Sequence, residues 1–136
     1  MAAGTHTLTA HRSAKPNPLG EIETGWVGSD EDGTVPTLVI SFPYDCELLS
    51  LFTDAVDSAT AEYNITLVDA NGFDRLQGVG ADRHTTNAEE VAVFFASTSM
   101  HPTVRAGESL TLTLADNSDT SSSGVIIVRY RALANV

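Results

Sequence analysis

The stretch Leu38–Phe52, LVISFPYDCELLSLF, decides how this chain folds. Ten of its fifteen residues are apolar, but Pro43, Asp45 and Glu47 interrupt the run in its middle. A buried helix would not carry a proline there, because proline removes a backbone donor and clashes with the preceding turn. A membrane span would not carry the two acids. The stretch therefore predicts a strand on each side of a corner at 43–45, where pairing breaks at a sheet edge or at a crossing between sheets.

The chain after this stretch shows the two-residue alternation of strands. In 109–115, SLTLTLA, every second residue is a leucine, so the leucines share one face. In 124–133, GVIIVRYRAL, apolar residues fall on both faces, which indicates a strand covered on both sides at one end. The continuous apolar run 91–97, VAVFFAS, predicts a central strand. No segment has the apolar spacing of a helix over ten residues.

The fold class that follows is all-β, an antiparallel β-sandwich or jelly roll of about seven or eight strands. Polar turns separate the strands, for example SDEDG at 29–33 and the serine-rich loop at 116–124. A long loop with a short strand inside it is expected at 75–90. The main strands are expected at 20–27, 37–42, 46–56, 62–69, 91–97, 109–115 and 124–133.

Residues 1–19 predict an extended N-terminal arm, followed by a β-sandwich domain at 20–136. The residues before Pro16 and Pro18 are biased toward extended backbone. The arm is basic, whereas twelve acids and no base lie between Glu21 and Asp74. We therefore expect the arm to lie on the acidic body of its own chain or of a neighbour, unless it is disordered. Its candidate partner-binding residues are His6, His11, Arg12, Lys15, Pro16 and Pro18.

The charge balance excludes some partners. Eighteen acids and seven bases give a net charge of −11. A nucleic-acid groove needs a basic stripe, so direct nucleic-acid binding is not expected. The sequence also has no run long and apolar enough for a spanning helix and no apolar export segment near residue 1, so no membrane partner is expected. Cys46 is the sole cysteine and is interpreted as a small buried hydrophobe in a strand.

No catalytic, cofactor or metal residue is assigned from the sequence. The four histidines lack the close spacing of metal ligands. Asp82-Arg83-His84 is interpreted as a solvated loop, because neighbouring residues on a loop point apart. DANGFD, at 69–74, offers oxygen ligands of the kind calcium prefers, but it lacks the EF-hand pattern and is interpreted as a hairpin turn. Whether such acidic turns bind calcium stays open.

Three segments resemble a known family. They are VPTLVISFPYDCELLSLFTDAVDSATAEYNITLVDANG (35–72), PTVRAGESLTLTLAD (102–116) and SGVIIVRYRAL (123–133). The strand pair broken at Pro43, the AGESLTLTL segment and the serine-rich loop before the last strand resemble capsid decoration (cement) proteins of tailed bacteriophages. The resemblance spans roughly residues 35–133 and carries no catalytic motif.

The resemblance implies a non-enzymatic structural protein of the virion. Such a protein decorates and stabilises the outer surface of the capsid, as a trimer that bridges capsid subunits. Its partners would be the major capsid protein and further copies of itself. It would be made in the host cytoplasm and end on the outside of the virion.

Other functions stay open. A carbohydrate- or receptor-binding sandwich module of a phage tail would suit Trp26, Tyr63 and Tyr130 if they formed an exposed aromatic platform. A head–tail connector or tail-tube element is a further alternative. An enzyme would require His84 or His101 to meet carboxylates in a pocket.

Overall fold

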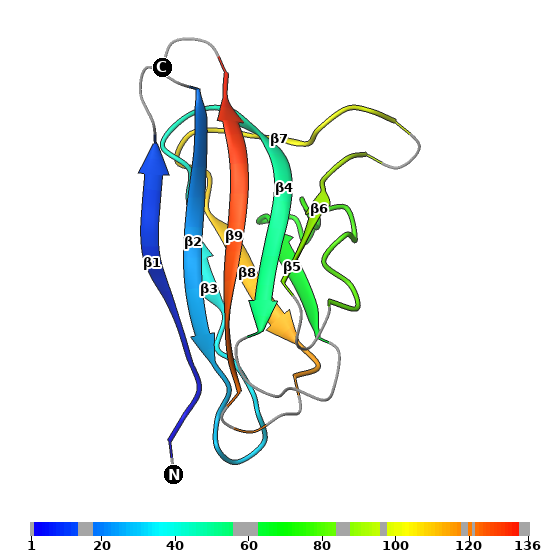
Figure 1. The fold of residues 1–136 in the computed structure, drawn as a ribbon. Coiled ribbons are helices and arrows are strands. Elements are labelled where there is room, and N and C mark those ends of the chain that lie inside the picture. The colour runs from blue at the N-terminus through cyan, green and yellow to red at the C-terminus, as the bar shows by residue number, and fades with distance from the viewer. Residues whose placement is uncertain are drawn as a thin grey trace.

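The computed structural model describes residues 2–13, 18–55, 63–83, 88–95, 98–117, 120 and 122–133. Within these residues the chain forms nine strands and no helix (Figure 1). No helix long and apolar enough to span a membrane occurs in this part of the chain. The strands are β1 (Thr5–Ser13), β2 (Leu19–Val27), β3 (Leu38–Ile40), β4 (Cys46–Ala55), β5 (Asn64–Val68), β6 (Glu89–Ala92), β7 (Thr103–Val104), β8 (Leu110–Ala115) and β9 (Ser123–Ala132).

The strands form two antiparallel sheets. The large sheet has the order β1-β2-β9-β4-β6, and β7 also pairs with β4. The small sheet has the order β3-β8-β5. Figure 1 shows the small sheet behind the large one, so the two face each other across the core. The predicted all-β sandwich is confirmed; its jelly-roll form stays a prediction.

The corner in the opening stretch is a crossing between the two sheets. β3 belongs to the small sheet and β4 to the large one, with Pro43, Tyr44 and Asp45 between them. Because proline cannot donate to a ladder, the chain leaves one sheet there and enters the other. β3 is also an edge strand, so both expectations for this corner are met.

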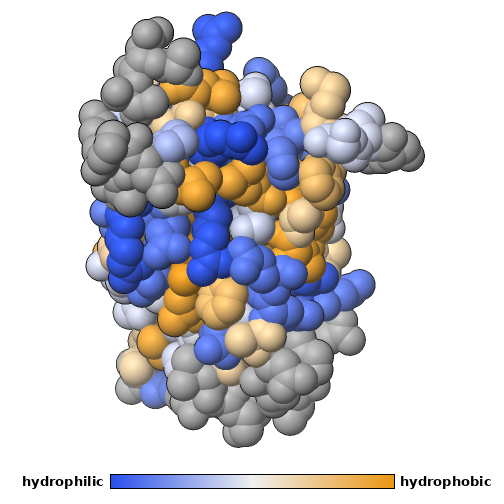
Figure 2. Space-filling model, turned by 45° about the horizontal axis from the view of Figure 1, so that its top comes forward, coloured by the Kyte–Doolittle hydropathy of each residue, from blue (hydrophilic) through white to orange (hydrophobic). Residues whose placement is uncertain are grey.

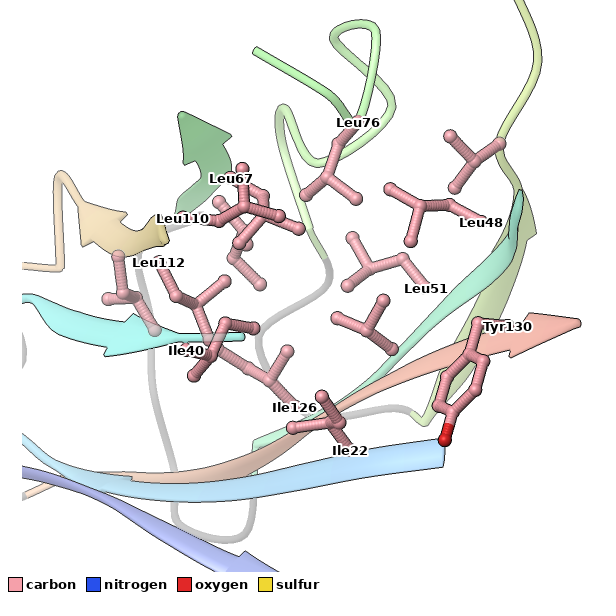
Figure 3. Close-up of a cluster of buried hydrophobic side chains, with 14 of the residues drawn as sticks. Ile22, Ile40, Leu48, Leu51, Leu67, Leu76, Leu110, Leu112, Ile126 and Tyr130 are labelled. Carbon is pink, nitrogen blue, oxygen red and sulfur yellow. The ribbon is translucent and has the colours of Figure 1, made fainter. Parts of the chain in front are cut away.

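The core lies between the sheets and is built from alternating inward side chains (Figure 3). Leu110, Leu112 and Leu114 of β8 are buried, as the alternation of this segment predicts. Ile126, Val128 and Tyr130 of β9 face them from the large sheet. The remaining large buried side chains include Ile22, Trp26, Ile40, Phe42, Leu48, Leu51, Tyr63, Ile65, Leu67 and Leu76.

One strand prediction is wrong, and one strand was not predicted. VAVFFAS is not a central strand, because β6 covers only Glu89–Ala92 and pairs on one side, with β4. A continuous apolar run fits an exposed loop of apolar residues as well as a buried strand, and Phe94 and Phe95 are exposed. Residues 5–13, for which no strand was predicted, form β1.

Candidate interaction surfaces

The described part of the predicted arm lies on the body of its own chain. β1 pairs with β2, and the side chains of His6, Thr9, His11 and Arg12 form hydrogen bonds with the body. His6 is buried, and its ring nitrogens are 3.1 Å from the Pro36 carbonyl oxygen and 3.1 Å from Thr24 Oγ1. Burial lowers the pKa of His6, and the hydrogen bond to the Pro36 carbonyl opposes this in part. His6 therefore anchors β1 as a neutral group.

His11 and Pro18 also contact the body. His11 Nε2 lies 2.8 Å from the Tyr130 hydroxyl, and the Pro18 carbonyl accepts a hydrogen bond of 2.7 Å from the amide of Ala132. Lys15 and Pro16 lie outside the described residues. The role of these residues in binding a partner, and the division of the chain at residue 19, stay predictions.

Arg12 joins β1 to two acids of β2. Its Nη1 atom is 2.9 Å from Glu21 Oε1 and 2.9 Å from Glu23 Oε1. These contacts raise the pKa of Arg12, and the hydrogen bond from Arg12 lowers the pKa of Glu23. The charge complementarity predicted between a basic arm and an acidic body thus exists within the chain.

A row of paired charges continues across the outer face of the large sheet. Arg12, Glu21, Arg129 and Ser50 are successive cross-strand partners on β1, β2, β9 and β4. Arg129 binds both Glu21 (Nε–Oε2 3.2 Å) and Glu90 of β6. Hydrogen bonds from Ser50 and Arg129 lower the pKa of Glu90. We call Arg12, Glu21, Ser50, Glu90 and Arg129 the charge row. Its contacts link both edges of the large sheet.

An apolar hollow of about 380 Å³ opens beside the charge row. Its lining combines the apolar side chains of Leu19, Leu49 and Tyr130 with four residues of the charge row, which are Arg12, Glu21, Ser50 and Arg129. Leu19 is 46% exposed. Figure 2 shows patches of hydrophobic surface between hydrophilic side chains on one face of the molecule. An amphipathic hollow of this size fits an apolar or aromatic side chain of a partner.

The aromatic residues proposed for a sugar platform are all buried. Trp26, Tyr63 and Tyr130 belong to the core. The rings of Trp26 and Tyr63 meet edge to face at 5.6 Å, and Tyr130 meets Phe42 in the same way at 5.2 Å. The exposed platform that the carbohydrate-binding alternative required is therefore not formed, because these rings are buried in the core.

The other residues considered for chemistry have structural roles. Cys46 is buried, and burial raises its pKa to about 12. In the 69–74 turn, Asp69 accepts hydrogen bonds from the amides of Asn71 and Phe73, and Asp74 accepts from the amide of Leu67. The hairpin-turn interpretation is confirmed there. His84 lies outside the described residues, and among those described no three His, Cys, Asp or Glu side chains converge as a metal site would require.

A second surface was missed by the sequence reasoning. Phe94, Phe95 and Met100, which we call the apolar loop cluster, are 38%, 37% and 65% exposed. They lie between β6 and β7 on segments that project beyond the sheets, at the right of Figure 1. The sequence contains one indication of this surface: the apolar run Val93-Phe94-Phe95 is followed by residues that lack the alternation of a strand.

Comparison with known proteins bears on the fold. Neither a protein-family model nor a curated protein matches the chain. Among solved structures, a chain of the cyanophage Pam1 capsid asymmetric unit is similar, with a TM-score of 0.54 and 17% sequence identity. The match covers 93% of this chain and 94% of that chain, so the two have similar lengths. This chain has a fold found in a phage capsid.

Proposed function

We propose that the chain is a non-enzymatic structural protein of a phage virion, which decorates and stabilises the outer surface of the capsid. It binds the major capsid protein, as a trimer that bridges capsid subunits. The observation that carries this proposal is the similarity to a chain of the Pam1 capsid asymmetric unit over nearly the full length of both chains. At this sequence identity the similarity concerns the fold, and the function is our inference from it.

The architecture suits such a role for a physical reason. A protein that holds a shell together needs a rigid body and several surfaces that reach different partners. Here a filled core joins two sheets, and the charge row ties β1 to β6 across the outer face. Contacts that are weak one at a time become strong when a trimer makes them together, because binding of the first protomer raises the effective concentration of the others.

The proposal is tested on shells of the phage that encodes the protein, prepared without it. Purified protein is mixed with these shells, and the bound amount is measured by co-sedimentation over a range of concentrations. We expect saturable binding and a higher temperature of shell opening. Binding that does not saturate, or an unchanged opening temperature, would contradict the decorating role.

The self-association in the proposal is tested by light scattering after size exclusion, in solution and on protein released from shells. A trimer has three times the 14.4 kDa mass of one chain.

The role of the arm is tested by deleting residues 1–18. No large apolar residue of β1 belongs to the core, so the truncated sandwich should still unfold cooperatively. Unchanged attachment and self-association would remove the arm from the proposal.

A further inference from the structure

The apolar loop cluster lies in the least charged part of an acidic chain. Residues 91–104 form the longest stretch without Asp, Glu, Lys or Arg, in a chain of net charge −11. Two copies of such a chain repel each other through most of their surfaces. An uncharged, apolar segment is the part that approaches another copy with the least electrostatic penalty. Exposed large apolar side chains grouped in this way are typical of interaction sites.

The ring of Phe94 and the main chain at Phe95 and Met100 are held in place before any partner binds. The ring of Phe94 stacks on His101 at 4.6 Å and 25°, and His101 Nδ1 donates a 2.6 Å hydrogen bond to the carbonyl of Val93. The amide of Phe95 donates to the carbonyl of Met100 at 2.9 Å. A side chain fixed in this way loses little conformational entropy on binding, so its burial contributes more to affinity.

The apolar hollow on the large sheet offers a complementary surface. Leu19, Leu49 and Tyr130 line it together with Arg12, Glu21, Ser50 and Arg129. The two guanidinium groups are held in place by ion pairs with Glu21, Glu23 and Glu90. Arginine cations are attracted to the faces of aromatic rings, and Arg129 already lies over the ring of Phe52 at 5.5 Å. None of the residues that line the hollow belongs to the apolar loop cluster.

We propose that the apolar loop cluster of one copy docks into the apolar hollow of a second copy, between Leu19 and Leu49, with a phenylalanine ring facing Arg12 or Arg129. The occupant is a second copy because one chain carries both surfaces: an uncharged aromatic loop, and a hollow lined by apolar side chains and by ion-paired arginines whose charge is already balanced within the chain. A contact between two different patches repeats from copy to copy and closes into a ring when the rotation allows it. The inference deepens the proposed function, since it names the surfaces through which the trimer forms.

The first test is chemical cross-linking between two single-cysteine additions. One preparation carries Leu19→Cys and a second, of different tag length, carries Met100→Cys. The native Cys46 is buried, so it does not compete for the reagent. After mixing and treatment with a short bis-maleimide, we expect one major product that contains one chain of each kind. Each variant treated alone should give less than a tenth of this product.

A variant with both substitutions reports the number of copies in the assembly. If the docked copies close a three-membered ring, covalent products should stop at the trimer. If the covalent products stop at the dimer, the result supports the docking contact and contradicts the trimer of the proposed function. The two conclusions are thus separable. The cross-linking is done both in solution and on decorated shells, so that assembly on the shell alone is detected.

The second test measures the strength of self-association by sedimentation. Phe95→Ser and Leu19→Asp should each weaken it at least tenfold, because each removes one side of the contact. Phe73→Ser is the matched control, since Phe73 is 50% exposed and lies in the 69–74 turn, outside both surfaces. All three variants should keep the wild-type unfolding transition.

Two results would overturn the inference. One is the absence of the mixed cross-linked product both in solution and on shells. The other is a Phe95→Ser variant that keeps its self-association and loses shell binding, which would place the apolar loop cluster against the capsid protein. In either case, saturable binding of the wild-type protein to shells would leave the decorating role intact.

Discussion

The ring of Tyr130 lies against Gly20, its cross-strand partner, so that a β-carbon at position 20 would be 2.5 Å from Tyr130 Cζ. The other end of the same strand pair repeats the arrangement. Trp26 lies against its partner Gly124, where a β-carbon would be 2.6 Å from the indole ring. Each aromatic residue of the β2–β9 pair thus covers a glycine of the opposite strand and fills the space that a side chain would take.

Replacing either glycine by alanine should destabilise the fold. Gly20→Ala and Gly124→Ala each force a buried ring out of its position, and overpacking of this kind costs about 1–3 kcal/mol. The measurement is the free energy of unfolding in urea. Gly25→Ala in the same strand is the control, because its β-carbon meets only the exposed Thr9 methyl group, at 3.3 Å. A loss no larger than that of the control would show that the rings move aside freely.

The corner between the sheets depends on a second pair of residues. Asp45 Oδ1 accepts a 2.8 Å hydrogen bond from the amide of Ala106, beside a 2.9 Å bond from the amide of Gly107 to the carbonyl of Phe42. These bonds attach the corner to the turn that leads into β8. Asp45→Ala should therefore lower the free energy of unfolding by about 0.5–1.5 kcal/mol, the usual size for one hydrogen bond.

Two further variants separate the hydrogen bond from the charge. Asp45→Asn keeps an acceptor oxygen and should lose less stability than Asp45→Ala. Glu31→Ala removes one negative charge from an exposed turn, as Asp45→Ala does, and should leave stability nearly unchanged. Equal losses for Asp45→Ala and Glu31→Ala would mean that the corner does not use this bond.

His6 predicts a pH dependence of stability. Burial lowers the pKa of His6 in the folded chain below its unfolded value of about 6.5. Above about pH 6.5 the ring is neutral in both states and adds no pH dependence. As the pH falls below that value, the unfolded chain binds the proton first, so stability falls until the folded-state pKa is reached. Acidification should therefore loosen β1.

The measurement is urea unfolding from about pH 7.5 to 5.5, above the range in which most carboxyl groups titrate. His6→Asn should show a smaller loss on acidification than the wild type. His101→Gln keeps His6 and should keep the loss that His6 causes. If His6→Asn and the wild type lose stability in parallel, the pH dependence does not originate at His6.

Local pattern predicts most of the strands but not β1. β8 and β9 can be predicted from the sequence because the apolar pattern that marks each strand lies within a few neighbouring residues. In β1 the residues that face the sandwich are His6, Leu8 and His11, and a bulge between Leu8 and Ala10 shifts the alternation. A period-two search for apolar residues finds nothing there, although threonine at every second position from residue 5 to 9 is a weak strand signal.

The charge row could be found only from the tertiary structure, and the apolar loop cluster had only an ambiguous signal in the sequence. Glu21 and Arg129 belong to two strands far apart in the chain, and only the pairing of β2 with β9 makes them partners. The VFF run was misassigned because hydrophobicity alone does not separate a buried strand from an exposed apolar loop. Long-range register and exposure are therefore what the structure adds.

The ion pairs of Arg12 help to hold β1 on the large sheet. Arg12→Glu would place a third carboxylate beside Glu21 and Glu23, where Arg12 now forms two 2.9 Å contacts. The repulsion should detach β1 at low salt and fade at high salt, because the Debye length falls from about 30 Å at 0.01 M to about 3 Å at 1 M. Hydrogen exchange of the amides of residues 6–12 measures this, with those of β9 as the internal reference.

Arg12→Gln is the matched variant, since it removes the cation without adding an acid. At 0.01 M salt the β1 amides should exchange fastest in Arg12→Glu, and at 1 M salt the two variants should converge. If β1 also attaches to shells, attachment of Arg12→Glu should show the same dependence on salt. Exchange rates that do not change with salt would mean that main-chain pairing with β2, rather than the ion pairs of Arg12, keeps β1 on the sheet.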